Sequence, residues 1–481
     1  MYLGLDIGTS AVKAVLVKEN GEILGKADSS HPIKHPKALW SEQDPLDWVK
    51  STKKTCHQLK TDYLSDWNKI KAVGLSGQMH GSVFLDDHDK VIRPAILWND
   101  GRSFNESKHL KKALPEIDQI SGVFPMPGFT APKVMWLEKN EAHNFKKIKS
   151  ILLPKDYIRF IMSGDKSTDC ADAAGTLWFN QNERKWSEML CSLSSTKINW
   201  LPKIYEGTEF SSAVSEIGSK TFGLKKGIKI VAGGGDASAG ACGVGAVSEN
   251  FCLLSLGTSG QLFTVRSSYL PPRGGMVHSF AHCIPKHWFH MACMLNGARP
   301  LSWWAEVSKE NIKTLIDESR NAVRKNIPIF LPYLTGERTP HNDAHIRGAF
   351  YGIENATGRA ELTRSILEAI TFSFVDAKEA LIKSGSSLSK AAVIGGGSKS
   401  DFLMQLMANQ LETNLIRYKG SEIGPAVGVA RLCMVADGIS YKDAMKEPIK
   451  DKLFSPENMD SSNLDRYRLL YNTLKPFAQP E

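Results

Sequence analysis

Short apolar runs bounded by turn residues alternate with helical patterns along most of the 481-residue chain. In the first hundred residues the apolar runs predict strands at 2–7, 11–17, 70–75 and 82–85. The spacing over about 45–60 predicts a helix between them, and residues 101–220 are mainly helical in pattern. This mixture of hairpins with a crossover helix is typical of an α/β fold.

The pattern that opens the chain returns beyond its midpoint. Residues 5–10 and 254–259 each run from an apolar strand into Gly-Thr-Ser, and another apolar run follows each of them. The copies differ at one position, where Asp6 is replaced by Ser255. We therefore expect two similar domains that face each other, with an acid on only one side of the cleft between them.

Strands ending in three glycines extend the repeat. The strand at 228–232 ends in Gly233-Gly234-Gly235 before a small-residue helix, and the strand at 391–394 ends in Gly395-Gly396-Gly397. Further helices are predicted at 300–324, 359–383 and 424–436. Because 481 residues exceed the size of one core, we predict two domains, 1–247 and 248–481.

Composition and charge exclude several classes of protein. The net charge of +9 comes from dispersed lysines, whereas a nucleic-acid-binding surface needs a basic stripe or arm. No run approaches the roughly 20 apolar residues that cross a bilayer, and no cleavable leader is recognisable. Eight cysteines without CxxC spacing predict buried, reduced thiols. We therefore expect a cytoplasmic protein that binds neither nucleic acid nor membrane.

Two histidines and several absent motifs narrow the chemistry further. His278 and His282 are four residues apart, but without a third ligand nearby a structural role is favoured over zinc. The chain has no GxxxxGK[ST] motif and no GxGxxG motif, which excludes a P-loop enzyme and disfavours a dinucleotide fold. Paired Gly-Thr-Ser turns instead offer backbone N–H and hydroxyl donors to a phosphate. These turns are Gly8-Thr9-Ser10 and Gly257-Thr258-Ser259.

Two acids stand out beside the glycine-rich turns. An unpaired carboxylate is costly in an apolar strand, so Asp6 either caps a neighbour or pairs with a lysine, or it holds Mg²⁺ through water. We favour the magnesium interpretation because the phosphate-type turn is adjacent. Asp236 follows three glycines and precedes a helix, which suits an N-cap, a general base, or both.

These features together resemble the FGGY family of carbohydrate kinases. The resemblance rests on the Gly-Thr-Ser pair, the glycine-rich strand ends, the patterns at 128–137 and 348–353, and their continuation at 361–368. It implies two actin-like, ribonuclease H-like domains of the sugar kinase, actin and heat-shock ATPase superfamily, with a catalytic cleft between them. It further implies ATP and Mg²⁺, Asp236 as the base, Asp6 on the metal side and Lys13 near the phosphates.

Within the family, the chain is most similar to members that phosphorylate D-xylulose. The similarity rests on the segments 39–45, 78–81, 97–102, 153–157 and 336–341. It implies that Met79 and His80 contact the ketopentose and that Gly396 and Ser400 contact the adenosine. Those members commonly have Asn after the catalytic Asp, where this chain has Ala237, with Ser238 next at a different helical phase.

Two alternatives stay open at this point. Another sugar of the family, such as ribulose, gluconate or glycerol, could be the substrate, although Met79-His80 argues for xylulose. An actin-like fold could also serve an ATP-driven chaperone or a filament, because fold alone does not fix function. A homodimer, supported by the segment 453–481, is a further expectation.

Overall fold

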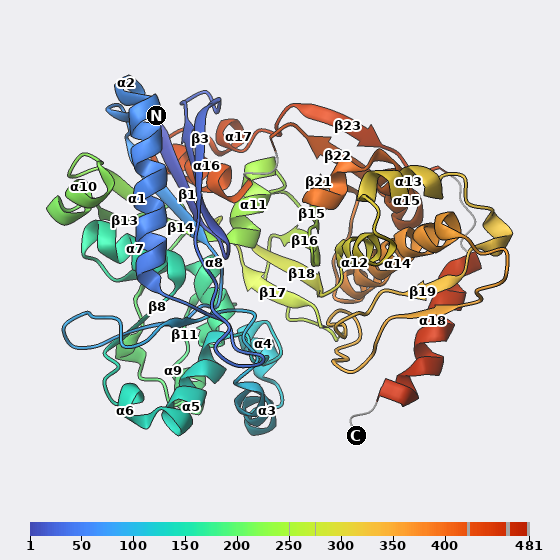
Figure 1. The fold of residues 1–481 in the computed structure, drawn as a ribbon. Coiled ribbons are helices and arrows are strands. Elements are labelled where there is room, and N and C mark those ends of the chain that lie inside the picture. The colour runs from blue at the N-terminus through green and yellow to red at the C-terminus, as the bar shows by residue number, and fades with distance from the viewer. Residues whose placement is uncertain (250, 275, 421–423, 458–461, 479–481) are drawn as a thin grey trace.

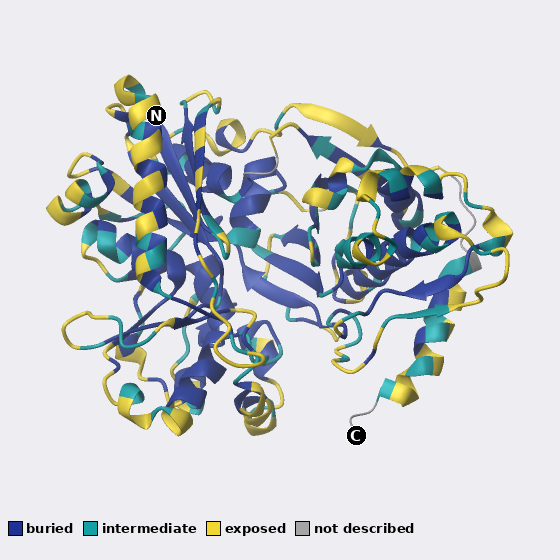
Figure 2. Cartoon of the chain, viewed as in Figure 1, coloured by how far each residue is buried: buried dark blue, intermediate teal, exposed yellow. Residues whose placement is uncertain are grey.

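The chain folds into two lobes, each built around a mixed β-sheet (Figure 1). The computed structural model describes all residues except 250, 275, 421–423, 458–461 and 479–481. Figure 2 shows that the strands at the centre of both lobes are buried, whereas the exposed residues lie on the outer faces of the helices. The predicted domain boundary near residue 247 lies in the connection between the helix α11 (Asp236–Val244) and the strand β15 (Phe251–Leu256).

The first sheet has the strand order β13-β14-β5-β1-β2-β3. Its strands are β1 (Tyr2–Ile7), β2 (Ala11–Val17), β3 (Ile23–Ser30), β5 (Ala72–Gly77), β13 (Phe210–Ala213) and β14 (Lys229–Gly235). Helices α1 (Pro45–Asp62), α7 (Pro154–Ser163) and α10 (Glu216–Phe222) share a core with one face of the sheet. β1 is buried along its whole length because helices cover both faces, as expected for a parallel neighbour of β5.

The second sheet has the strand order β17-β18-β16-β15-β21-β22-β23. Its strands are β15 (Phe251–Leu256), β16 (Gly260–Arg266), β17 (His278–Ala281), β18 (Trp288–Met294), β21 (Lys390–Ile394), β22 (Asn414–Tyr418) and β23 (Lys450–Phe454). One face packs on α14 (Arg359–Lys383), α15 (Asp401–Leu411) and α18 (Ser462–Leu474).

Both sheets share one topology, which corrects one detail of the predicted repeat. Six strands of one sheet correspond to six strands of the other in their order of pairing and in their parallel or antiparallel direction. In matching order they are β1, β2, β3, β5, β14 and β13 in the first sheet and β15, β16, β18, β21, β22 and β23 in the second. The Gly-Thr-Ser turns are therefore equivalent. The triple glycines are not, because Gly395 ends β21, the counterpart of β5, whereas Gly235 ends β14, the counterpart of β22.

Two helices cross between the lobes. α16 (Gly424–Ala436) connects β22 to the last strand of the second sheet but packs on β1 and β5 of the first, and α11 (Asp236–Val244) shares a core with β15 of the second. The two helices also pack against each other at very short range. A Cβ on Gly428 would lie 1.8 Å from the Ala239 carbonyl oxygen, so glycine is required there. The small residues of both predicted helices thus join the lobes.

The remaining elements extend each lobe. β4 (Glu42–Gln43) lies between β3 and α1 and pairs with β7 (Ala95–Ile96). Between β5 and β13 lie β7 and β6 (Val83–Leu85), α3 (Phe104–Ala113), α4 (Ile117–Ser121), α5 (Thr130–Asn140), α6 (Ala142–Phe145), β8 (Ser150–Leu152), β9 (Ser167–Asp169), α8 (Cys170–Ala173), β10 (Phe179–Asn180), β11 (Lys185–Trp186), α9 (Glu188–Leu193) and β12 (Lys203–Tyr205). Outside this region lie α2 (Leu64–Trp67), β19 (Ile329–Leu331), β20 (Ala349–Tyr351) and α17 (Tyr441–Ala444).

The helix predicted at 300–324 is two helices. α12 (Arg299–Ser308) ends at Lys309, which adopts a left-handed conformation with φ 53°, and α13 (Ile312–Ser319) then begins with Asn311 as its cap. All eight cysteines are buried and none forms a disulfide, as predicted. Among the described residues, no helix has both the length and the apolar character needed to span a membrane.

Candidate active site

Three adjacent parallel strands of the first lobe bring the predicted sugar and acid residues together. In the order β14-β5-β1, their carboxyl ends carry Asp236, Met79 with His80, and Asp6. In α/β sheets, ligands bind at the carboxyl ends of the strands. Residues that lie far apart in the sequence thus form one candidate site.

Asp6 is a buried carboxyl group with a charged neighbour on one side. Lys13 lies opposite it on β2 and Ser76 beside it on β5. Burial, and then the negative charge of Asp236, raise the pKa of Asp6 to about 7, while Lys13 opposes this shift. Its Oδ1 atom is buried without a hydrogen-bond partner among the described residues. A carboxylate oxygen in this state fits a role as a ligand for a cation.

Asp236 is the first residue of α11. Its Oδ1 accepts a hydrogen bond from the Ala237 amide at 2.8 Å, and the cap position before it is occupied by Gly235. The N-cap interpretation is therefore wrong by one residue, and Asp236 makes no side-chain cap. Burial raises the pKa of Asp236 to about 6. Because its charge acts on Asp6, the two acids share one electrostatic environment.

Met79 and His80 form the turn after β5. Met79 is buried against the end of β14, since a Cβ on Gly235 would lie 2.8 Å from the Met79 sulfur. His80 has a left-handed backbone with φ 67°, and its Nδ1 lies 2.7 Å from the Gly175 carbonyl oxygen. Its ring meets Phe129 edge to face at 4.6 Å. A single orientation of the imidazole is thus imposed from two sides.

Residues that the sequence analysis did not single out hold this turn in place. Lys133 is fully buried on α5, and its Nζ donates to the carbonyl oxygens of His80 at 2.9 Å and Ile96 at 3.2 Å. The Thr130 hydroxyl donates to the same His80 oxygen at 3.1 Å. Both belong to the pattern at 128–137, whose presence was the only sequence signal for their role.

A buried charged cluster supports the far side of the His80 ring. The Lys155 Nζ lies 2.5 Å from Asp156, 2.7 Å from Asp169 and 3.0 Å from Asp172. These carboxylates could in principle hold a metal, but the ammonium already occupies their centre. Asp169 caps α8, which leads directly to Gly175 and its contact with His80.

Arg338 brings a positive charge from the second lobe. It lies in the loop after β19, close enough to the Cys293 thiol of β18 to hydrogen-bond with it. Burial, with the charges of Lys133 and Arg338, lowers the pKa of His80 to about 3. Burial and the Arg338 charge also lower the pKa of His278. A neutral His80 can both donate and accept hydrogen bonds.

The first Gly-Thr-Ser turn is fixed by side chains around it. Gln43 donates to the Thr9 carbonyl oxygen at 2.7 Å, and the Trp98 indole donates to the Thr9 hydroxyl at 3.0 Å. A ring nitrogen of His31 lies 3.1 Å from the Gly8 carbonyl oxygen. With its carbonyl oxygens already bonded, the turn is stiff around Ser10.

The second turn is held by the start of α12. The Ala298 amide donates to the Gly257 carbonyl oxygen at 2.7 Å, and the Gly297 amide donates to that of Thr258 at 3.0 Å. A Cβ on Gly297 would lie 2.3 Å from the Ser259 oxygen, so only glycine fits. Both turns therefore have rigid supports of different construction.

The predicted adenosine residues lie at the end of β21. Gly396 is exposed, and a Cβ there would meet nothing within 4 Å, so the surface above it is open. The Ser400 hydroxyl accepts from the Leu403 amide at 3.2 Å and caps α15. Ser400 thus has a structural task in addition to any ligand contact.

The position after Asp236 differs from the pattern of xylulose-phosphorylating relatives. Ala237 is half-buried against the core of the first lobe. Ser238 is buried, and its hydroxyl donates to the Gly235 carbonyl oxygen at 3.2 Å. Ser238 therefore does not replace an amide at this position.

No cluster of metal-ligating side chains among the described residues contains both His278 and His282. His278 lies in β17 and stacks on Phe280, and the His282 Nδ1 accepts from the Ile284 amide at 3.1 Å. Cys242 and Cys283 lie near His282, with their sulfur atoms 3.5 Å apart. The Ile284 bond engages the Nδ1 lone pair, whereas Nε2 is buried without a hydrogen-bond partner among the described residues, so the structural role of His282 stays a prediction.

The duplicated sheets with an acidic site at their strand ends define an enzyme of the actin-like ATPase fold. The comparison with family models gives the family. Residues 1–243 match the N-terminal domain of the FGGY family of carbohydrate kinases, and residues 252–436 match its C-terminal domain. The chain belongs to this family and is a carbohydrate kinase, for which ATP is the expected phosphoryl donor. The chaperone and filament alternatives are thereby excluded.

Individual relatives agree with this assignment. The chain is 40% identical to a xylulose kinase of Escherichia coli over 91% of its own length and 90% of that protein. A structure described as a xyloylose kinase from Brucella ovis matches with a TM-score of 0.95, 36% identity and 99% coverage of both chains. A gluconate kinase from Lactobacillus acidophilus gives a TM-score of 0.89 at 26% identity, covering 99% of this chain and 97% of that one. The fold is therefore shared by kinases of different sugars.

Proposed function

We propose that this kinase transfers the γ-phosphoryl group of ATP to the terminal hydroxyl of D-xylulose, giving D-xylulose 5-phosphate and ADP. The observation that carries the proposal is the meeting of Asp236, Asp6 and the Met79-His80 turn at three adjacent strand ends. The similarity to xylulose kinases over nearly the whole chain supports the choice of sugar.

In this proposal Asp236 is the general base. Its pKa of about 6 leaves it ionised at neutral pH while it is more basic than an exposed carboxylate. The sugar oxygen forms its bond to the γ-phosphorus as the bond from that phosphorus to the ADP oxygen breaks, and the hydroxyl proton passes to Asp236. In such a loose transition state, positioning and charge neutralisation are the main tasks of the protein.

Asp6 is the residue proposed to hold Mg²⁺, through water. Its buried Oδ1 without a partner among the described residues fits a cation, and carboxylates are ligands that Mg²⁺ prefers. When bound, Mg²⁺ neutralises phosphate charge. The turns Gly8-Thr9-Ser10 and Gly257-Thr258-Ser259 are proposed to bind the phosphates of ATP through N–H and hydroxyl groups, and Lys13 adds positive charge. Gly396 and Ser400 are proposed to lie against the adenosine.

The Met79-His80 turn is proposed to select the sugar. In a buried, neutral imidazole whose Nδ1–H donates to the Gly175 carbonyl oxygen, Nε2 can accept a hydrogen bond from one sugar hydroxyl, and Met79 supplies an apolar wall. The ring nitrogen Nδ1 already contacts Gly175, which leaves Nε2 for the sugar. The predicted cytoplasmic location and homodimer stay predictions, and residues 458–461 and 479–481 of the predicted dimer segment lie outside the described residues.

The test is an ADP-release assay with D-xylulose, D-ribulose, gluconate and glycerol. The wild type is expected to prefer D-xylulose. Asp236→Asn is expected to lose about 10²- to 10⁴-fold in kcat, with ATP binding measured by calorimetry unchanged. Asp62→Asn, at the exposed end of α1, is the matched control. Near-normal turnover by a folded, ATP-binding Asp236→Asn protein would contradict the assignment.

Ala237→Asn tests the departure from the family pattern at the position after Asp236. The substitution restores an amide beside Asp236 at a half-buried position. We expect the substitution to lower the KM for D-xylulose relative to the wild type and to leave the KM values for the other three sugars unchanged, measured in the same panel. An unchanged ranking and unchanged KM values would show that position 237 does not contact the sugar.

A further inference from the structure

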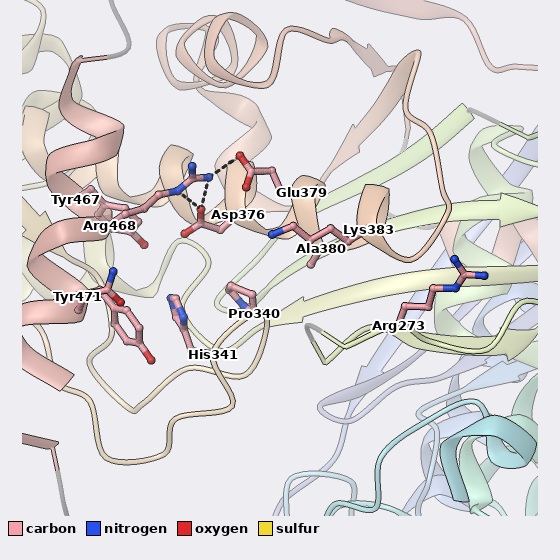
Figure 3. A pocket seen from close by; sticks show the side chains of 11 residues that line it. Arg273, Pro340, His341, Asp376, Glu379, Ala380, Lys383, Tyr467, Arg468 and Tyr471 are labelled. Atoms are coloured by element: carbon pink, nitrogen blue, oxygen red, sulfur yellow. Dashed lines mark hydrogen bonds and ion pairs between the residues drawn. The ribbon is translucent and has the colours of Figure 1, made fainter. Parts of the chain in front are cut away.

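A cavity of about 480 Å³ lies in the second lobe, apart from the candidate active site. Figure 3 shows that it is bordered by α18 on one side, by α14 behind, and by the loop that carries Pro340 and His341. Its size lies within the range of small-molecule sites, roughly 300–1,000 Å³. None of the residues proposed for sugar or ATP lines it.

The charges around the cavity leave an excess of positive charge. Arg468 is neutralised by Asp376 at 2.7 Å and Glu379 at 2.6 Å. Arg273 and Lys383 also line the cavity, and neither forms an ion pair with any residue that the structure describes. In Figure 3 the Lys383 ammonium points toward Asp376 and Glu379, whereas the Arg273 guanidinium points away from them. With three cationic and two acidic side chains, the lining keeps one net positive charge, which favours an anionic ligand.

The opposite wall is aromatic. The His341 ring stacks on Tyr471 with 3.7 Å between ring centroids and an angle of 19°. Its Nε2 lies 2.8 Å from the Tyr333 hydroxyl, which fixes the ring further. Flat ring faces beside cations suit an organic anion with a carbon skeleton better than a bare inorganic ion.

The loop that forms this wall also reaches the candidate sugar site. Glu337 and Asp343 close it with two backbone hydrogen bonds of 2.7 and 2.8 Å, so residues 337–343 form one compact unit. Arg338 lies at one side of this unit, where its charge acts on His80, and His341 lies in the cavity. A displacement of His341 therefore also displaces Arg338.

We propose that the cavity binds a small phosphate monoester of a sugar, and that its occupancy changes the affinity of the sugar site through Arg338. The phosphate group would contact the Lys383 ammonium, with Arg273 adding positive charge at the edge of the cavity, and the sugar carbons would lie against His341 and Tyr471. The coupling rests on the proposed function, whereas the binding does not. A binding measurement and a kinetic measurement therefore separate the two.

The binding test titrates ribose 5-phosphate into the full chain by calorimetry, with ribose and inorganic phosphate as comparison ligands. Saturating D-xylulose and a non-hydrolysable ATP analogue are present, so that the active site is blocked. We expect the ester to bind more tightly than either comparison ligand. The double variant Arg273→Ala/Lys383→Ala is expected to weaken binding about tenfold or more, and Lys313→Ala, an exposed lysine on α13, is expected to leave it unchanged.

The kinetic test measures the KM for D-xylulose with and without ribose 5-phosphate. We expect a shift of about twofold or more in the wild type and in Lys313→Ala, and none in the double variant. Undetectable binding, equal binding of inorganic phosphate, or undiminished binding by the double variant would overturn the site. If the ester binds and the double variant weakens its binding, but the KM for D-xylulose does not change, the site stands and only the coupling is overturned. Absence of turnover with D-xylulose would refute the proposed function and leave the binding result intact.

Discussion

Replacing Lys133 by methionine removes the main support of the Met79-His80 turn, which we propose binds the sugar, while keeping most of the side-chain volume. The ammonium of Lys133 is fully buried and donates to the carbonyl oxygens of His80 and Ile96. His80 has φ 67°, a conformation that residues with a side chain rarely adopt. The substitution therefore tests whether the turn keeps this conformation by itself.

The magnitude follows from the cost of the conformation that Lys133 stabilises. A left-handed backbone at a non-glycine residue costs about 1–2 kcal/mol. If that cost is no longer offset, the fraction of molecules with a competent His80 falls about 5- to 30-fold, and the apparent KM for the sugar rises by the same factor. The kcat should change little, because Asp236 lies on a different element.

The assay is steady-state turnover with D-xylulose, accompanied by thermal unfolding. Thr130→Val removes a neutral bond to the same oxygen, and we expect a smaller rise in KM of about two- to tenfold. Lys139→Met, exposed at the end of the same helix, is the control and should match the wild type. A folded Lys133→Met enzyme with wild-type KM, or with lost kcat and unchanged KM, would refute this reasoning.

Three further predictions concern ionisation and packing. The kcat/KM should fall about tenfold per pH unit below about pH 6, because a protonated Asp236 cannot accept the hydroxyl proton; a flat profile from about pH 5 to pH 8 would contradict the general base. The Mg²⁺ concentration needed for half-maximal activity should rise below about pH 7, where Asp6 is protonated, and Mg²⁺ titrations at several pH values would check this. Gly428→Ala should lower the free energy of unfolding by about 1–3 kcal/mol, because its Cβ would lie 1.8 Å from the Ala239 oxygen. Gly240→Ala should instead raise it by about 0.5–1 kcal/mol, because the nearest atom to its Cβ would be 3.7 Å away. Both are measured by urea denaturation, and equal effects of the two substitutions would refute the packing argument.

The sequence predicted the local elements well where periodicity is strong. The strands at 2–7 and 11–17 and the helices at 359–383 and 424–436 are confirmed at the same or nearly the same residues. The error at 300–324 arises at Lys309, because a helical pattern can continue through a residue whose backbone turns left-handed. The mistaken equivalence of the triple glycines has another cause, since strand order depends on long-range pairing that local composition does not encode.

The supports of the site were harder to predict than its acids. Asp6 and Asp236 are visible because a carboxylate in an apolar strand or after three glycines is unusual. Lys133 acts through a carbonyl oxygen 53 residues away, and nothing in its own sequence position signals that it is buried. Arg338 acts from the other lobe, so only the packing of the two lobes reveals its charge near His80.

The difference between the two Gly-Thr-Ser copies now extends beyond one residue. Asp6 lies between Lys13 on β2 and Ser76 on β5, whereas its counterpart Ser255 lies between Gln261 on β16 and Ile394 on β21. The second lobe thus has neutral residues at all three equivalent positions. Asp6 lies in β1, and Asp236 and the Met79-His80 turn directly follow β14 and β5 of the same sheet, so their mutual geometry does not depend on the distance between the lobes. A movement of the lobes would instead change the position of the second turn relative to Asp236.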